Sequence, residues 1–128
     1  MLLNPESMKP IYVQIAEWLE GEILSGNIRE EERIYSQYQL ADMFDINPAT
    51  AAKGLNLLAD NNIVYKKRGL GMFVSPQARE IVRQKRQDTI LKQLVFDLVC
   101  EAERLRVSED CLAEMIKEAR EQLKEEEQ

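Results

Sequence analysis

Apolar residues recur at intervals of four in the first part of the chain. They are Ile11, Ile15, Leu19 and Ile23. This spacing predicts an amphipathic helix over residues 10–24. Pro10 suits its first turn, where the missing N–H costs nothing. Ser25, Gly26 and Asn27 are predicted to end it.

Two short helices joined by a tight turn are predicted next. Ser36 is a good N-cap for a first helix whose apolar face includes Leu40 and Phe44. Asn47 is predicted to cap a second helix that begins at Pro48 and runs to about Asp60. The inward face of this second helix consists of Ala51, Gly54, Leu55 and Leu58.

Two β-rich runs, residues 63–65 and 72–74, flank the segment Lys66-Lys67-Arg68-Gly69-Leu70-Gly71. The pattern predicts a hairpin with a basic tip, in which the two glycines permit positive φ. Residues 33–35 are a candidate short strand. Two further helices are predicted, over residues 78–105 and from Ser108 onward, each with a stripe of apolar residues along one face. We therefore expect a first domain over residues 1–76 and a second region over residues 77–128.

Charge is distributed unevenly along the chain. The formal net charge is −6, which is unusual for a protein that binds nucleic acid. Between Arg33 and Ser75, however, five Lys and Arg residues outnumber three Asp and Glu residues. Because screening confines electrostatic effects to about 10 Å, the local face matters more than the total. The net-positive middle segment is therefore where a polyanion would bind.

The composition disfavours several other classes of function. The chain has no histidine and two cysteines, Cys100 and Cys111, so no metal site or cofactor is expected. We find no pairing of nucleophile and base and no phosphate-binding loop, so we predict a protein that is not an enzyme. No membrane-spanning run and no secretory signal are evident. These features favour a cytoplasmic protein with buried, reduced thiols; a redox role for the cysteines stays open.

The predicted elements follow in the order helix, short strand, two tightly joined helices and basic hairpin. This order predicts a winged helix-turn-helix. The fold class is mainly α (α+β), with a two-stranded wing and a C-terminal helical dimerisation region. The second helix of the pair is then the recognition helix. The residues predicted to contact DNA are Ser36, Tyr38, Asn47, Ala49, Thr50, Lys53, Asn56, Lys66, Lys67, Arg68, Gly69 and Gly71. Several have a structural alternative: Ser36 and Asn47 cap helices, Tyr38 could simply pack, and the basic tip could only protect a strand edge.

Three separated motifs carry a resemblance to a known family. They are Pro10-Ile11-Tyr12-Val13-Gln14-Ile15-Ala16 followed by Gly26, Ser36-Gln37-Tyr38-Gln39-Leu40-Ala41, and Arg68-Gly69-Leu70-Gly71-Met72-Phe73-Val74. Together they resemble the DNA-binding domain of the GntR family over roughly residues 9–75. The start of the recognition helix, Asn47-Pro48-x-Thr50, and the short C-terminal part are similar to the YtrA subfamily. The resemblance implies a dimeric and usually repressing bacterial regulator, often associated with transporter operons.

The chain departs from the family pattern at three positions. Many members have arginine where this sequence has Tyr38, Pro48 and Ala52. Arginine to guanine is the commonest specific base contact, so we expect greater dependence on Lys53, Thr50 and the wing. A methyl contact between Ala49 and thymine would add to these. Weak binding by one copy would be offset by two half-sites held by a dimer.

The C-terminal apolar stripes predict the dimer interface. Their residues are Leu91, Leu94, Val95, Leu98, Leu105, Leu112, Ile116 and Leu123. About fifty residues in two helices seldom form a self-sufficient core, so a second copy is expected to cover these faces. The predicted partners are thus a double-stranded DNA operator and a homodimer, with any small-molecule effector unknown. The alternative hypothesis is a winged-helix module that binds protein without specific DNA binding.

Overall fold

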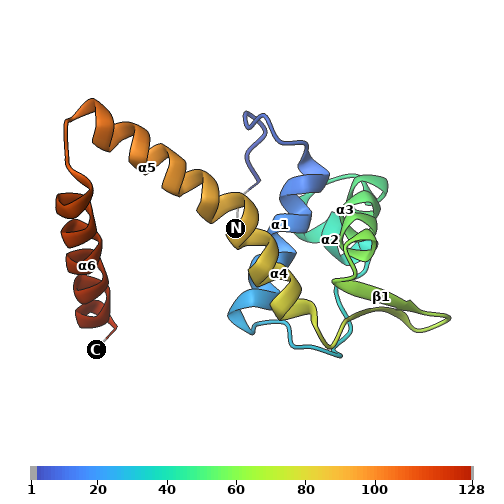
Figure 1. Cartoon of the computed structure of the whole chain (residues 1–128). Coiled ribbons are helices and arrows are strands. Elements are labelled where there is room, and N and C mark those ends of the chain that lie inside the picture. Colours follow the sequence, from blue (N-terminus) through green and yellow to red (C-terminus); the bar gives the residue numbers. More distant parts are fainter. Residues whose placement is uncertain (1–2, 128) are drawn as a thin grey trace. The chain divides into compact units, whose positions relative to one another are not determined.

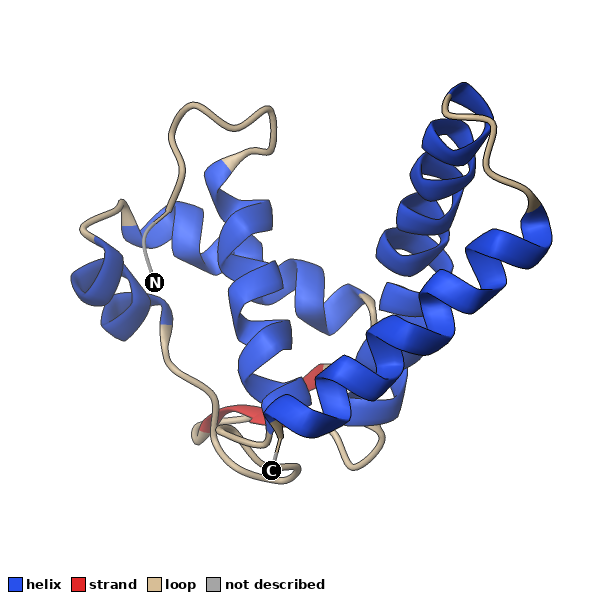
Figure 2. Cartoon of the chain, turned by 90° about the vertical axis from the view of Figure 1, so that its left-hand side faces the viewer, coloured by secondary structure: helices blue, strands red, loops and turns tan. Residues whose placement is uncertain are grey.

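The computed structural model describes residues 3–127. Its elements are α1 (Ile11–Ser25), α2 (Gln37–Phe44), α3 (Pro48–Asp60), β1 (Val64–Lys67), β2 (Gly71–Val74), α4 (Ala78–Arg86), the π-helical turn η1 (Gln87–Leu91), α5 (Lys92–Arg104) and α6 (Glu109–Glu126) (Figure 1). Helices predominate, and the two strands form the described sheet (Figure 2). The predicted fold class, mainly helical with a two-stranded wing, is confirmed. The chain divides into two units, one ending at Arg86 and the other beginning at Gln87.

The core of the first unit forms around α1. Ile15, Leu19 and Ile23 are completely or almost completely buried along one face of this helix, as their four-residue spacing predicts. Leu40 of α2 and Leu58 of α3 are fully buried in the same core. The helix ends at Gly26, whose φ of 87° is the left-handed conformation that glycine adopts without penalty. The core thus fixes α2 and α3 against α1.

The first unit extends beyond the predicted boundary at residue 76. Ala78 and Val82 of α4 are fully buried in the core of the first unit. Lys85 Nζ lies 2.8 Å from the carboxylate of Glu20, and Arg86 donates a 2.7 Å hydrogen bond to the carbonyl of Glu17. Helix α4 is therefore part of the first unit, because its apolar face packs on α1.

Two local expectations were wrong. Residues 33–35 do not form a strand: Arg33 forms only an isolated bridge with Phe73. The single helix predicted over residues 78–105 is interrupted by the π-helical turn at Gln87–Leu91, where the first unit ends. Such turns are wider than an α-helix and are uncommon.

The second unit is a pair of helices with little buried surface. Ser108 caps α6 by accepting a hydrogen bond from the backbone N–H of Cys111, as predicted. Ala102 is the one buried hydrophobic residue among those described in this unit. Cys100 and Cys111 are both exposed, so the expectation of buried thiols was wrong for the single chain. Two helices do not enclose enough volume to bury them.

Candidate nucleic-acid interface

The outward face of α3 is polar and accessible. Asn47 caps the helix by accepting a 2.8 Å hydrogen bond from the N–H of Ala49, and Pro48 occupies the first turn. The predicted inward residues Ala51, Gly54, Leu55 and Leu58 are all buried. Among the predicted contact residues, Asn47, Ala49, Lys53 and Asn56 are exposed and Thr50 is half-buried. One face of α3 is thus held by the core while the other remains free.

Gly54 determines how closely α3 approaches α1. A Cβ atom at Gly54 would lie 2.9 Å from the carbonyl oxygen of Tyr12 and 3.1 Å from Cγ2 of Ile15. Only glycine fits without displacement, since real Cβ atoms do not approach so closely. The contact also brings the ring of Tyr12 near the neighbouring Lys53, whose Nζ lies 5.9 Å from the ring centroid. Such exposed cation–π contacts contribute about 0.5–1 kcal/mol, so this one can orient Lys53 without immobilising it.

Helix α2 begins with a complete capping box. Ser36 accepts a hydrogen bond from the N–H of Gln39, and the Gln39 side chain accepts one from the N–H of Ser36. The hydroxyl and amide of Ser36 are therefore already engaged in the cap. Tyr38, in contrast, is 69% exposed. Of the two predicted residues, Tyr38 is the more exposed, while the Ser36 hydroxyl keeps its proton to donate because it only accepts in the cap.

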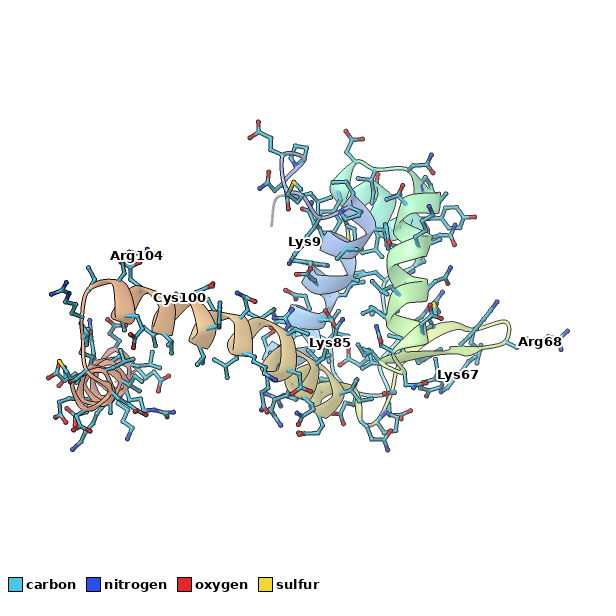
Figure 3. The ribbon with its side chains drawn as sticks, turned by 45° about the horizontal axis from the view of Figure 1, so that its top comes forward. Lys9, Lys67, Arg68, Lys85, Cys100 and Arg104 are labelled. Carbon is cyan, nitrogen blue, oxygen red and sulfur yellow. The ribbon has the colours of Figure 1, made fainter. Side chains whose placement is uncertain are left out.

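The hairpin register moves two of the predicted tip residues into a strand. Lys66 pairs with Met72 and Lys67 pairs with Gly71, so both lysines belong to β1. The turn itself is made of Arg68, Gly69 and Leu70. Gly69 and Gly71 have φ values of 79° and 110°, as the prediction of positive φ requires. Figure 3 shows Arg68 at the far end of the hairpin, pointing away from the body of the unit.

The three basic residues of the hairpin have different surroundings. Lys66 and Arg68 are exposed. Lys67 is half-buried, and its Nζ lies 4.3 Å from the centroid of the Phe73 ring and 5.7 Å from that of Tyr65. Lys67 therefore packs on the aromatic side chains of its own hairpin. The free charge of the wing is concentrated on Lys66 and Arg68.

Tyr65 connects the hairpin to the loop that precedes α2. Its hydroxyl donates a 2.7 Å hydrogen bond to the Glu31 carboxylate. This hydrogen bond, together with desolvation and the negative charge of Glu31, raises the pKa of Tyr65 above its usual value. The contact holds the base of the wing against the loop.

Helix α3 and the hairpin lie on the same side of the first unit, away from α4 (Figures 1 and 3). Helix α1 contacts both α3 and α4 and so lies between them. The polar face of α3 and the basic hairpin are thus available to one extended partner. Sequence reasoning overlooked two residues next to this surface, Tyr12 and Arg33, because both are brought there by contacts between distant parts of the chain.

The second unit exposes an apolar surface wider than the predicted stripe. Seven of the eight predicted interface residues are between 40% and 65% exposed, and Leu112 is half-buried. Four further large hydrophobic residues that the stripe omitted are also exposed: Ile90, Phe96, Val99 and Met115. Ile90, Val99 and Met115 were overlooked because they lie beside the stripe. Phe96, two residues before Leu98, lies on the opposite side of α5.

Two other kinds of feature are absent from residues 3–127. No helix in this part of the chain is both long and apolar enough to cross a membrane. The same residues contain no group of three or more His, Cys, Asp or Glu side chains placed to hold a metal ion.

Comparison with known families gives a match that spans half of the chain. The model of "Bacterial regulatory proteins, gntR family" matches residues 11–74, which run from the start of α1 to the end of β2. The matched residues therefore include the whole of α2, α3 and the hairpin, and none of the second unit.

Two characterised relatives come from Bacillus subtilis (strain 168). The HTH-type transcriptional repressor YtrA is 28% identical over 116 residues, covering 91% of this chain and 88% of the relative. The HTH-type transcriptional repressor NagR is 32% identical over 80 residues, covering 62% of this chain. The match spans only 33% of the length of NagR.

Solved structures show the same fold. A putative GntR-family transcriptional regulator from Bacteroides thetaiotaomicron has a TM-score of 0.76 and 29% identity, covering 89% of this chain and 99% of that one. The DNA-binding domain of AraR, solved in complex with operator ORX1, has a TM-score of 0.53 and 27% identity. That match covers 59% of this chain and 93% of the AraR domain.

Proposed function

The chain belongs to the GntR family of bacterial regulatory proteins, and from this premise we propose that it is a sequence-specific repressor that binds an operator of two half-sites as a homodimer. In this proposal α3 enters the major groove and the wing contacts the flanking backbone. Two similar proteins are named as repressors, YtrA and NagR. The observation that carries the proposal is the free polar face of α3 beside a basic hairpin.

The size and polarity of this face suit a DNA groove. The major groove is wide enough for one helix, and side chains near the helix N-terminus reach base edges most easily. Ala49, Thr50 and Lys53 occupy that position in α3. The exposed Lys66 and Arg68 would then supply phosphate contacts, which orient the protein without reading sequence.

The second unit supports assembly into a dimer. Its exposed leucine, isoleucine and valine side chains are between 40% and 65% exposed, and large exposed apolar patches commonly mark interaction sites. A second copy of the same unit would cover this surface and supply the second DNA-binding unit. A two-fold dimer requires an operator with matching two-fold symmetry.

Equilibrium DNA binding tests the regulatory proposal. Fragments that the purified protein selects from its own genome would serve as labelled probes in a salt series of fluorescence anisotropy measurements. We expect Lys53→Ala to reduce the preference for selected over unrelated DNA. Lys117→Ala, which removes an exposed lysine of α6, is the matched control and should change nothing.

Two outcomes would contradict the proposal. Absence of salt-sensitive DNA binding by the wild-type protein would favour the alternative of a protein-interaction module. A monomeric mass by light scattering at micromolar concentration would contradict the dimer. Glutamate substitution of Leu94 and Leu98 together should convert the dimer to a monomer, since it places charge within the proposed interface.

A further inference from the structure

Arg33 is a cationic side chain between α2 and the wing that the sequence did not assign to DNA. Its backbone bridges to Phe73 of β2, and three residues later Ser36 caps α2. Its side chain is exposed. The position of Arg33 is therefore determined from both sides, by the sheet and by the start of a helix.

Gly71 provides the space that the Arg33 guanidinium occupies. A Cβ atom at Gly71 would lie 2.9 Å from Nε of Arg33 and 3.3 Å from Nη2. Any side chain at this position would push the guanidinium away from the hairpin. Gly71 also has a φ of 110°, a conformation that side chains rarely allow. The guanidinium thus lies beside the wing at Gly71, in space that a side chain there would occupy.

The charge of Arg33 is not neutralised within residues 3–127, where no carboxylate forms an ion pair with it. The two nearest acidic residues in the sequence have other partners. Glu31 accepts the hydrogen bond of Tyr65, and Glu32 lies 3.9 Å from Arg29. In a chain with 23 acidic and 17 basic residues, an exposed guanidinium without a carboxylate partner among residues 3–127 is available for an external anion.

The surroundings of Arg33 point to the kind of anion. Arg33 lines one small surface hollow together with Ser36, Tyr38 and Gly71, three residues already expected near DNA. A wider hollow of about 470 Å³ is lined by Arg33, Ser36 and Gln39. The smaller hollow lies between α2 and the hairpin, since Tyr38 and Gly71 both line it.

We propose that Arg33 binds a phosphate of the DNA backbone and bridges the contacts made by α2 and the wing. This proposal rests on the proposed function. A guanidinium can donate two parallel hydrogen bonds to phosphate oxygens, which fixes orientation as well as adding attraction. Many family members have an arginine at the position of Tyr38. Arg33 would supply part of the positive charge that is missing there. As a phosphate contact it sets register and not base preference.

The test compares Arg33→Gln with Arg29→Gln by fluorescence anisotropy. Arg29 is an exposed arginine close in sequence, and it is paired with Glu32, so its replacement matches the change in charge. The probes are the selected operator fragment and an unrelated duplex of equal length. Arg33→Gln is expected to weaken both by the same factor, roughly tenfold or more, since it removes a charge-assisted hydrogen bond. The slope of log affinity against log salt should fall by about 0.9 for each phosphate that the variant no longer neutralises.

Each outcome separates this proposal from the proposed function. Wild-type affinity and slope in Arg33→Gln would overturn the role of Arg33 and leave the repressor proposal intact. A loss confined to the operator would assign Arg33 to a base and also overturn the phosphate contact. Absence of salt-dependent binding by the wild type would instead refute the proposed function. Arg33→Lys, which keeps the charge but not the paired donors, should retain the slope and lose only part of the affinity. Circular dichroism of each variant excludes unfolding as the cause.

Discussion

The ammonium of Lys85 lies 2.8 Å from the carboxylate of Glu20, and this ion pair joins the last turn of α4 to α1. The Glu20 side chain is only 2% exposed, whereas that of Lys85 is 35% exposed. A buried carboxylate needs a partner, since an unpaired charge away from water is costly. The pair therefore secures the end of α4 at the point where the first unit ends.

Lys85→Met should destabilise the first unit, because it removes the ammonium that pairs with the buried carboxylate of Glu20. We expect the free energy of unfolding to fall by about 1–3 kcal/mol, measured by urea denaturation. Arg83→Met is the matched control, since Arg83 forms an exposed pair with Glu80 on the same helix. Such surface pairs contribute about 0–1 kcal/mol. Equal effects of the two substitutions would show that the Glu20 contact adds no stability.

The two helical glycines should respond in opposite ways to alanine. Gly54→Ala places a methyl group 2.9 Å from the Tyr12 carbonyl oxygen, and overpacking of this kind costs about 1–3 kcal/mol. At Gly21 the nearest atom to a new Cβ would be 3.8 Å away, at the end of the flexible Arg86 side chain. Gly21→Ala should therefore stabilise α1 by up to about 1 kcal/mol. Thermal denaturation of the two variants measures both effects, and a stabilising Gly54→Ala would contradict the close helix contact.

Removal of the Glu31 carboxylate should lower the pKa of Tyr65. The hydrogen bond to Glu31 is the main cause of the raised pKa, so Glu31→Ala removes both that bond and the nearby negative charge. Because the folded state favours the neutral phenol, this contribution to stability is present below the usual pKa of tyrosine, near 10. It is lost as the pH rises through the raised value. Titration of the Tyr65 ring by NMR measures the change, and an unaltered pKa in Glu31→Ala would rule out the contact.

Lys67 and Arg68 should differ in what they contribute, although they are neighbours. Arg68→Ala is expected to reduce the salt slope of DNA binding by about 0.9 per phosphate contact and to leave stability unchanged. Lys67→Ala should instead destabilise the hairpin by about 0.5–1 kcal/mol, since it removes a cation from the faces of Phe73 and Tyr65. Anisotropy and thermal denaturation of both variants separate the two roles. Equal reductions in slope would mean that Lys67 leaves its aromatic contacts to bind DNA.

Local sequence signals predicted α1, α2 and α3 closely. Ser36 and Asn47 identify the starts of α2 and α3 because a cap depends on residues two or three positions away. The lysines of the hairpin were misplaced because the register depends on pairing with β2, which the turn residues alone do not determine. The contact between Arg33 and Gly71 joins segments separated by two helices, so no local pattern indicates it. The packing of α4 on α1 and the exposure of both cysteines are likewise tertiary properties.

The position of Cys100 allows the face of α5 used in the dimer to be tested. Cys100 follows Leu98 by two residues, which places it roughly 200° around the helix axis from the predicted stripe, beside the polar pair Gln93 and Asp97. Figure 3 shows it on α5. The reaction of Cys100 with a maleimide is measured in two proteins that both carry Cys111→Ser: the dimer, and the monomer made by Leu94→Glu and Leu98→Glu together. If the stripe forms the interface, Cys100 should react equally rapidly in both. A cysteine introduced as Leu98→Cys in a Cys100→Ser and Cys111→Ser background should be protected until the dimer dissociates. Protection of Cys100 itself would place the interface on the opposite face of α5, which carries Gln93, Phe96 and Asp97, and would contradict the assignment.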